Sequence, residues 1–215
     1  MADFHINKRT YSTKTLLTSL KERQLIPSRI ALKNNIDHIF QTLERVGLTN
    51  LETLTRALNN AGKREALSLE TGIEENYLNL LRREVNSYFP TPVPLSNFSD
   101  TLPEIVATLE TLGIKNTKQL FEQKEPDLEK HQFDTLEQEQ LNTLRSCADL
   151  SRLYGVGPMF ARILISAGIT SVESFVKNEP EEIVALYERA TDKKADFSAA
   201  DIAFSRGIAV YLNVV

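Results

Sequence analysis

The stretch LYGVGPMFAR at 153–162 has the spacing of a backbone anion site. Gly155 and Gly157 flank Val156, and an apolar helical pattern follows Pro158. Glycines let the backbone approach a ligand closely, and the N–H groups of a first helical turn have no partners inside the helix. An exposed helix N-terminus of this kind binds anions, and a phosphate group fits it.

The side chains next to the two glycines each have an expected role in this anion site. Val156 is expected to face inward and pin the turn, and Pro158 is expected at the first helical position, where its missing N–H costs nothing. Two arginines bracket the turn and are candidates for contacts to neighbouring phosphates. Such contacts would follow the nucleic-acid backbone and not the base sequence. The predicted phosphate-binding set is Arg152, Gly155, Val156, Gly157, Met159 and Arg162.

The same turn is also an efficient way to pack two helices. Met159 and Phe160 are apolar where a solvated basic contact would be expected, so they indicate either core or a protein-docking surface. The net charge is −4, whereas phosphate affinity depends on the number of cations. Two functions therefore stay open: sequence-independent binding of a DNA or RNA backbone, and a protein–protein interaction scaffold in which the turns are purely structural.

Charge is distributed unevenly along the chain. Residues 1–35 contain seven Lys and Arg against two acidic residues, a net +5, which leaves −9 for the remainder. Such a basic arm can touch a nucleic acid or cover an acidic body in the same chain or in a partner. The charges lie at helix-surface intervals and form no dense run, which favours the second role.

No residue pattern indicates catalysis. His5, His38 and His131 lack metal-ligand spacing, and Cys147 is the single cysteine, expected as a small buried hydrophobe. No phosphate-binding loop, nucleophile elbow or dinucleotide fingerprint occurs. We expect no enzymatic activity, no catalytic residues, no cofactor and no metal.

Composition indicates a globular protein of the cytoplasm. Apolar residues make up 41% and charged residues 25% of the 215 positions. No apolar run is long enough to cross a bilayer, and the start of the chain does not resemble a secretory signal. We expect no membrane association, and the sequence does not indicate an oligomeric state.

One template recurs three times, and it predicts a helix, a tight turn and a second helix. The segments are LERVGLTNLETL at 43–54, LETLGIKNTKQL at 109–120 and LISAGITSVESF at 164–175. Each glycine is expected in the left-handed conformation just after a helix ends. Thr49 with Glu52, and Thr170 with Glu173, fit a capping box for the second helix, and Asn116 is the candidate cap in the middle copy.

A longer internal match divides the chain into two halves. Leu78, Leu81 and Arg82 correspond to Leu141, Leu144 and Arg145, which places FPTPVP at 89–94 on RLYGVG at 152–157. We expect an N-terminal helical unit at 1–89, a proline-rich connector at 90–98 and a C-terminal unit at 99–215. The end of the chain, SAADIAFSRGIAVYLNVV, indicates a capped helix whose apolar end either packs on the last unit or docks a partner.

The stretch LSRLYGVGPMFARILISAG resembles a helix-hairpin-helix motif, similar to the hairpin of family X DNA polymerases. More closely still, the whole chain resembles bacterial proteins described as domain of unknown function 4332. Residues 102–215 cover that pattern from end to end, and residues 36–89 cover its front part, with Thr71-Gly72-Ile73 as a linker turn. The resemblance implies an all-α, SAM-like helical bundle of tandem helix-hairpin-helix units, and a nucleic-acid backbone as the ligand.

Overall fold

The structure, a computed structural model, describes residues 3–123 and 133–212. The described residues form twelve α-helices and two 3-10 helices and contain no β-strand, only two isolated β-bridges. The expected all-α fold is confirmed. His131 and the last three residues of the C-terminal tail lie outside the described residues.

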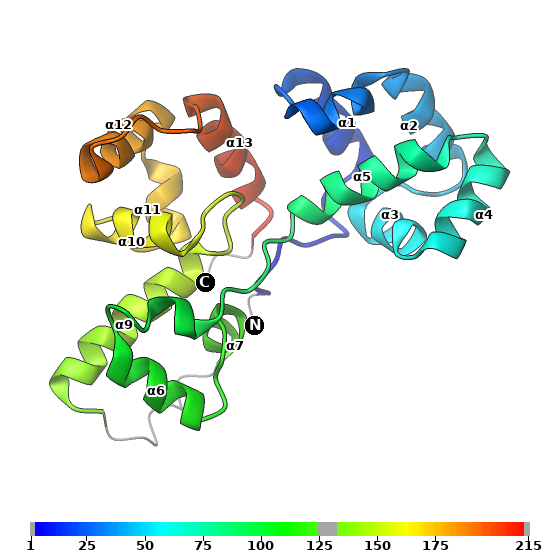
Figure 1. The fold of residues 1–215 in the computed structure, drawn as a ribbon. Coiled ribbons are helices and arrows are strands. Elements are labelled where there is room, and N and C mark those ends of the chain that lie inside the picture. Colours follow the sequence, from blue (N-terminus) through cyan, green and yellow to red (C-terminus); the bar gives the residue numbers. More distant parts are fainter. Residues whose placement is uncertain (1–2, 124–132, 213–215) are drawn as a thin grey trace. The chain divides into compact units, whose positions relative to one another are not determined.

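The first part of the chain forms a unit at Ile6–Phe89, called here the amino-terminal unit. Its core is built from the apolar stripes of helices at i, i+3 and i+4 spacing, with Leu16, Leu20, Phe40 and Leu43 buried. Its elements are α1 (Thr13–Glu22), η1 (Pro27–Lys33), α2 (Ile36–Arg45), α3 (Leu51–Leu58), α4 (Ala61–Thr71) and α5 (Glu75–Ser87), as Figure 1 shows.

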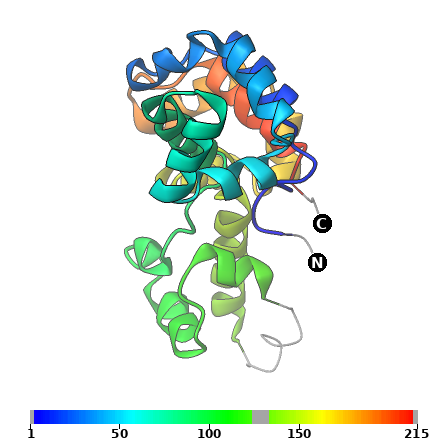
Figure 2. The same ribbon diagram turned by 90° about the vertical axis from the view of Figure 1, so that its right-hand side faces the viewer.

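The second unit combines Pro90–Val215 with Met1–His5 and is called here the carboxy-terminal unit. Its longest described helix, α9, packs against α6, α7 and α10, and α12 packs against α13 (Figure 2). The elements are η2 (Leu95–Phe98), α6 (Pro103–Thr111), α7 (Thr117–Glu122), α9 (Thr135–Leu150), α10 (Pro158–Ser166), α11 (Val172–Lys177), α12 (Pro180–Thr191) and α13 (Ala199–Ala209).

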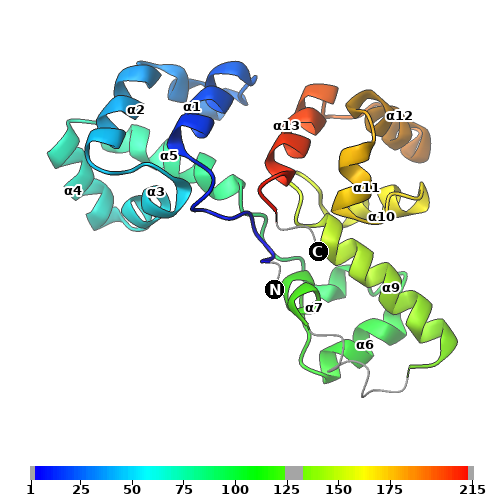
Figure 3. The ribbon, with the colours of Figure 1, turned by 180° about the vertical axis from the view of Figure 1, so that it is seen from behind.

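The start of the chain belongs to the carboxy-terminal unit and not to residues 6–89. It lies beside α7 (Figure 3), where the rings of Phe4 and Phe121 are 6.0 Å apart. His5 Nε2 is 2.9 Å from the carbonyl oxygen of Pro90. The predicted boundary at 89 therefore leaves out this return of the first residues, because no local pattern marks a contact with a segment more than 80 residues away.

The proline-rich segment 90–98 is part of the carboxy-terminal unit and not a separate connector. Val93 accepts a backbone hydrogen bond from Thr117 at 2.9 Å, and Leu95 donates one to the carbonyl of Lys115 at 2.9 Å. Leu95 and Phe98 are buried. The prolines keep residues 90–94 extended, and this extended backbone pairs with the turn before α7.

The three copies of the repeated template are the α2–α3, α6–α7 and α10–α11 pairs. Gly47, Gly113 and Gly168 have φ of 80°, 85° and 84°, the left-handed conformation that was expected. In each copy the residue after the glycine donates to a carbonyl five residues back, at 2.9–3.0 Å, which closes the end of the first helix.

The N-caps of the second helices lie one residue later than predicted in two copies. Asn50 and Ser171, not Thr49 and Thr170, cap α3 and α11. The carbonyl of Thr49 accepts instead from the backbone of Thr13 at 2.9 Å. This bridge holds the Thr49 peptide in place, and the next residue takes the extended cap conformation. Asn116 caps α7 as expected.

Four cations of the basic arm are paired inside the amino-terminal unit. Arg9 pairs with Glu52 at 3.0 Å and Lys21 with Asp37 at 2.7 Å, while Arg23 and Arg29 both contact Glu84. Much of the arm's charge therefore neutralises carboxylates of the same unit, the role that the spacing favoured.

Across 3–123 and 133–212, no helix is both long enough and apolar enough to span a bilayer.

Candidate functional site

The turn between α9 and α10 is built on Gly155 and Val156. Gly155 has φ of +78°, a conformation that glycine adopts at no steric cost. Val156 is 6% exposed, and its N–H donates to the carbonyl of Leu153 at 3.3 Å. Val156 therefore faces inward and anchors the turn, as predicted.

Gly157 is the N-cap of α10, and the fold does not require a glycine there. Its φ of −88° and ψ of 177° are open to any residue, and a Cβ atom would meet nothing within 4 Å. The other loop glycines of the chain all have positive φ. Neither backbone conformation nor packing therefore accounts for Gly157, and the absence of a side chain leaves open space beside the backbone at the start of α10. Pro158 occupies the first helical position, as expected.

The N-terminus of α10 has no internal compensation. Among the described residues no acceptor takes the N–H groups of Gly157, Met159 or Phe160, and the first turn contains no acidic residue. Each of the other eleven α-helices described has a side-chain cap, an acid in its first turn, or both. The positive end of the α10 dipole therefore carries N–H donors that have no partner among the described residues.

Arg152 does not reach the surface, so the prediction that it contacts phosphate is wrong. It is 2% exposed, and its guanidinium lies 4.1 Å from the centroid of the Phe121 ring. Its Nε donates to the carbonyl of Phe4 at 3.2 Å, and its Nη1 donates to Asp149 at 2.5 Å. Arg152 instead ties the start of the chain to α9.

Asp149 is a residue that the sequence reasoning missed. Besides pairing with Arg152, its second carboxylate oxygen accepts the N–H of Val172, the first residue of α11, at 2.7 Å. The matching N–H groups of the other two copies, those of Leu51 and Thr117, donate to backbone carbonyls. The i,i+3 spacing of Asp149 and Arg152 at the end of a helix was the one available signal.

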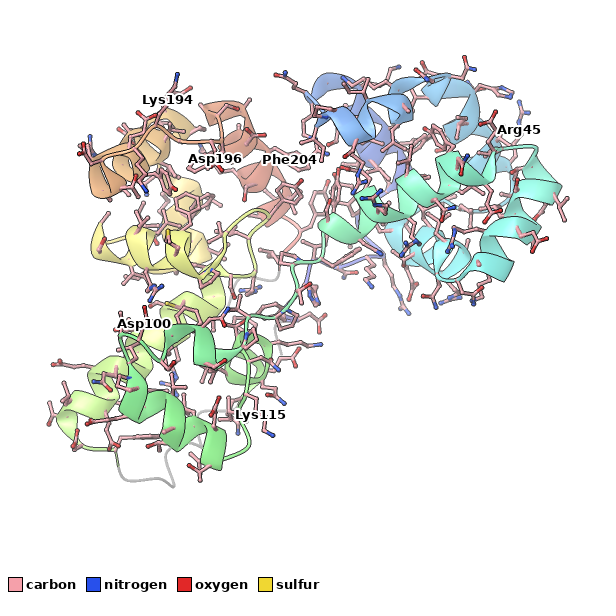
Figure 4. The ribbon with its side chains drawn as sticks, in the orientation of Figure 1. Arg45, Asp100, Lys115, Lys194, Asp196 and Phe204 are labelled. Atoms are coloured by element: carbon pink, nitrogen blue, oxygen red, sulfur yellow. The ribbon has the colours of Figure 1, made fainter. Side chains whose placement is uncertain are left out.

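Arg162 and Met159 are the side chains of the predicted set that reach solvent beside the turn. Arg162, 29% exposed, pairs with Asp100; its Nη1 donates to the two carboxylate oxygens at 2.9 and 3.1 Å. Asp100 lies in the loop before α6, where Figure 4 labels it. Met159 is 61% exposed. The turn thus combines free backbone donors, one paired arginine and one apolar side chain.

The remaining chemistry-bearing residues sit apart from this turn. Cys147 is buried in α9, and burial raises the pKa of its thiol to about 11, so the nucleophilic thiolate is disfavoured. Among the residues that the structure describes, no three His, Cys, Asp or Glu side chains are grouped to hold a metal ion.

Comparison with known proteins agrees with part of the resemblance. A family model described as "Domain of unknown function (DUF4332)" matches residues 100–202, which include α6–α12, the α9–α10 turn and the start of α13. No curated protein and no solved structure matches the chain. Over residues 100–202, the chain is a DUF4332 domain.

Proposed function

We propose that the α9–α10 turn is a helix-hairpin-helix element that binds the phosphate backbone of DNA or RNA without reading its sequence. The observation that carries this proposal is the N-terminus of α10, which has no cap and no acidic residue in its first turn and begins at a glycine that the fold does not require. A phosphate group supplies both the acceptors and the negative charge that this helix end lacks.

The proposed contacts follow from the geometry. Phosphate oxygens accept the N–H groups of Met159 and Phe160, and the missing Cβ of Gly157 leaves space for the approach. Arg162 exchanges Asp100 for phosphate, an exchange with a low cost because surface ion pairs contribute only about 0–1 kcal/mol. Buried Val156 keeps the turn in shape. Backbone donors contact phosphate alike whatever the base.

We also propose that the three repeated glycine turns and the α9–α10 turn belong to tandem helix-hairpin-helix units in which only the α9–α10 turn binds phosphate. Asn50, Asn116 and Ser171 place side-chain oxygens on the first-turn amides of α3, α7 and α11. These amides are already occupied, so a phosphate would have to displace a cap. The α9–α10 turn is then the single cradle of this type in the described chain.

Fluorescence anisotropy of a labelled, nicked duplex tests the proposal, with a labelled RNA of the same length beside it. We expect binding that weakens about threefold to fourfold for each phosphate neutralised by a cation between 50 and 200 mM salt. Gly157→Asp places a carboxylate at the cradle and should weaken binding of the duplex about tenfold or more, while circular dichroism should show an unchanged helix content. No binding at low salt, or equal binding by wild type and variant, would overturn the proposal.

A protein–protein scaffold is the second candidate, and the exposure of Met159 favours it. An apolar side chain at the tip of a turn, beside an arginine already paired with Asp100, suits docking to another protein. Apolar docking does not weaken as salt rises, because it rests on removing apolar surface from water. A partner complex that persists at high salt and is lost in Met159→Ser would support this function.

A further inference from the structure

A pocket of about 440 Å³ opens in the amino-terminal unit between α3 and α5. One face of α3 and one face of α5 form its walls, because residues 52, 56 and 59 follow helical spacing and residues 82 and 86 are four apart. Lys8, from the segment before α1, closes one side. The lining that matters here is Lys8, Glu52, Arg56, Asn59, Arg82 and Asn86.

Arg82 is the side chain that most clearly lacks a partner. It is half-buried on α5, and its Nε is buried with no acceptor among the described residues. None of the ion pairs found in that part of the chain includes it. Arg82 therefore has no carboxylate partner among the ion pairs of the described chain, and as a lining residue of the pocket its guanidinium can pair with an anion there.

Lys8 and Arg56 add two further cations with little internal neutralisation. The Lys8 ammonium lies 4.3 Å from the centroid of the Phe89 ring, a contact that leaves its charge intact. Arg56 is 71% exposed, and its nearest carboxylate oxygen, on Glu52, is 3.9 Å away, at the outer limit of an ion pair. Both side chains are available to a ligand.

Glu52 is the one acidic residue of the lining, and it is already held by a fourth cation. Arg9 Nε donates to Glu52 at 3.0 Å, and this hydrogen bond is the main reason why the pKa of the carboxyl is lowered. Glu52 therefore stays ionised at neutral pH. Three cations line the pocket against one carboxylate whose charge Arg9 offsets, so the pocket is strongly positive.

The donor set defines the ligand class. Two guanidinium groups, one ammonium and two side-chain amides present many N–H donors and one acidic acceptor, which suits a group with several anionic oxygens. Arginine in particular matches the geometry of phosphate. The volume exceeds that of one phosphate group and lies in the range of small-molecule sites.

We propose that this pocket, formed by Lys8, Arg56 and Arg82, binds a phosphate group, carried by a small phosphorylated molecule or by a nucleic-acid backbone. The site is independent of the α9–α10 turn, since all its residues belong to the amino-terminal unit. It also gives a role to Lys8, a cation of the basic arm that no carboxylate neutralises among the ion pairs of the described chain.

Isothermal titration calorimetry on the full chain tests the proposal at low salt, with pyrophosphate in one arm and a 12-nucleotide oligothymidylate in the other. We expect saturable binding in at least one arm. Pyrophosphate binding identifies a small phosphorylated ligand. Binding of the oligonucleotide alone identifies a nucleic-acid backbone at this pocket only when Gly157→Asp retains it and Arg82→Gln weakens it. No binding in either arm would overturn the proposal.

Matched variants place the binding in the pocket. Arg82→Gln should weaken it about tenfold or more, the factor for losing a charge-assisted hydrogen bond, and Lys8→Gln should weaken it in the same direction. Arg83→Gln, an exposed neighbour outside the lining, should change it less than twofold. Glu52→Gln should strengthen binding of the anion, because it removes the one negative charge from the pocket lining.

Equal effects of Arg82→Gln and Arg83→Gln would mean nonspecific attraction and would also overturn the proposal. Gly157→Asp should leave pyrophosphate binding unchanged, so failure at this pocket and failure at the α9–α10 turn give different results.

Discussion

Replacing Gly157 with serine should make the protein more stable and at the same time weaken its binding of nucleic acid. The backbone at Gly157 is already extended, as an N-cap requires, and a Cβ atom has open space around it. A serine Oγ placed there accepts the N–H of Met159 or Phe160, the donors that the proposed phosphate contact uses. Side chain and phosphate therefore compete for the same groups.

The magnitude follows from two contributions. Serine at an N-cap is better than glycine by a few tenths of a kcal/mol, and loss of glycine flexibility in the unfolded chain contributes roughly 0.4–1 kcal/mol. The free energy of unfolding should rise by about 0.5–1.5 kcal/mol, which raises the midpoint of thermal unfolding by about 1–6 °C. Binding should weaken about tenfold or more, because one charge-assisted hydrogen bond to phosphate is lost.

Differential scanning calorimetry and fluorescence anisotropy measure the two effects on the same samples. Gly155→Ser is the matched control: its φ of +78° is strained for serine, so it should lose stability by about 1–2 kcal/mol. A Gly157→Ser protein that is less stable than wild type would refute the geometry described for the cap. One that is more stable but binds nucleic acid as well as wild type would show that the α10 amides are not the ligands.

Three further predictions concern the carboxy-terminal unit. Arg152→Ala should lower the free energy of unfolding by about 3–5 kcal/mol in urea titrations, because it leaves a carboxylate and two carbonyls without their partner. Arg162→Ala, which removes a surface ion pair, should lower it by less than about 1 kcal/mol. Equal losses in the two variants would contradict the burial of Arg152. Cys147, whose pKa is raised to about 11, should react with Ellman's reagent at pH 8 only after unfolding, and rapid labelling of the native protein would contradict its burial. Because the thiol ionises at a lower pH in the unfolded chain than in the folded one, the free energy of unfolding should fall as the pH rises from 9 toward 11. In thermal unfolding, Ser171→Ala should lower the free energy of unfolding by about 1 kcal/mol and Thr170→Ala should leave it nearly unchanged. The reverse order would show that Thr170, the cap predicted from the sequence, is the N-cap of α11.

What could be predicted from the sequence is what depends on neighbouring residues. Left-handed glycines after helices, Pro158 at a first helical position and the inward Val156 follow from steric rules that act over a few residues. The predicted N-cap of α3 was wrong by one residue because Thr49 and Asn50 are both good caps. The choice between them depends on the hydrogen bond from the Thr13 N–H to the Thr49 carbonyl. The middle copy already indicated the answer, since Asn116 aligns with Asn50.

What could not be predicted depends on contacts between distant segments. Arg152 looked like a surface cation because it follows a helix and precedes a glycine turn, but Phe4, 148 residues away, covers it. The pocket lined by Lys8, Arg56 and Arg82 could not be predicted for the same reason, because Arg56 and Arg82 meet only when α5 packs against α3, and Lys8 is 74 positions from Arg82. Burial of a charged side chain is decided by its partners, and partners are not neighbours in sequence.

The third copy of the repeat holds its second helix differently from the first two copies. In the first two copies, a preceding extended segment supplies the carbonyl that takes the first amide of the short helix. In the third copy, the Asp149 carboxylate takes that amide, and Arg152 neutralises the carboxylate from the buried side. No extended segment is then needed to hold α11, and residues 151–157 connect α9 to α10. The Asp149–Arg152 pair thus takes the role at α11 that backbone pairing has at α3 and α7. The amides of Met159 and Phe160, which the proposed function assigns to phosphate, have no acceptor among the described residues.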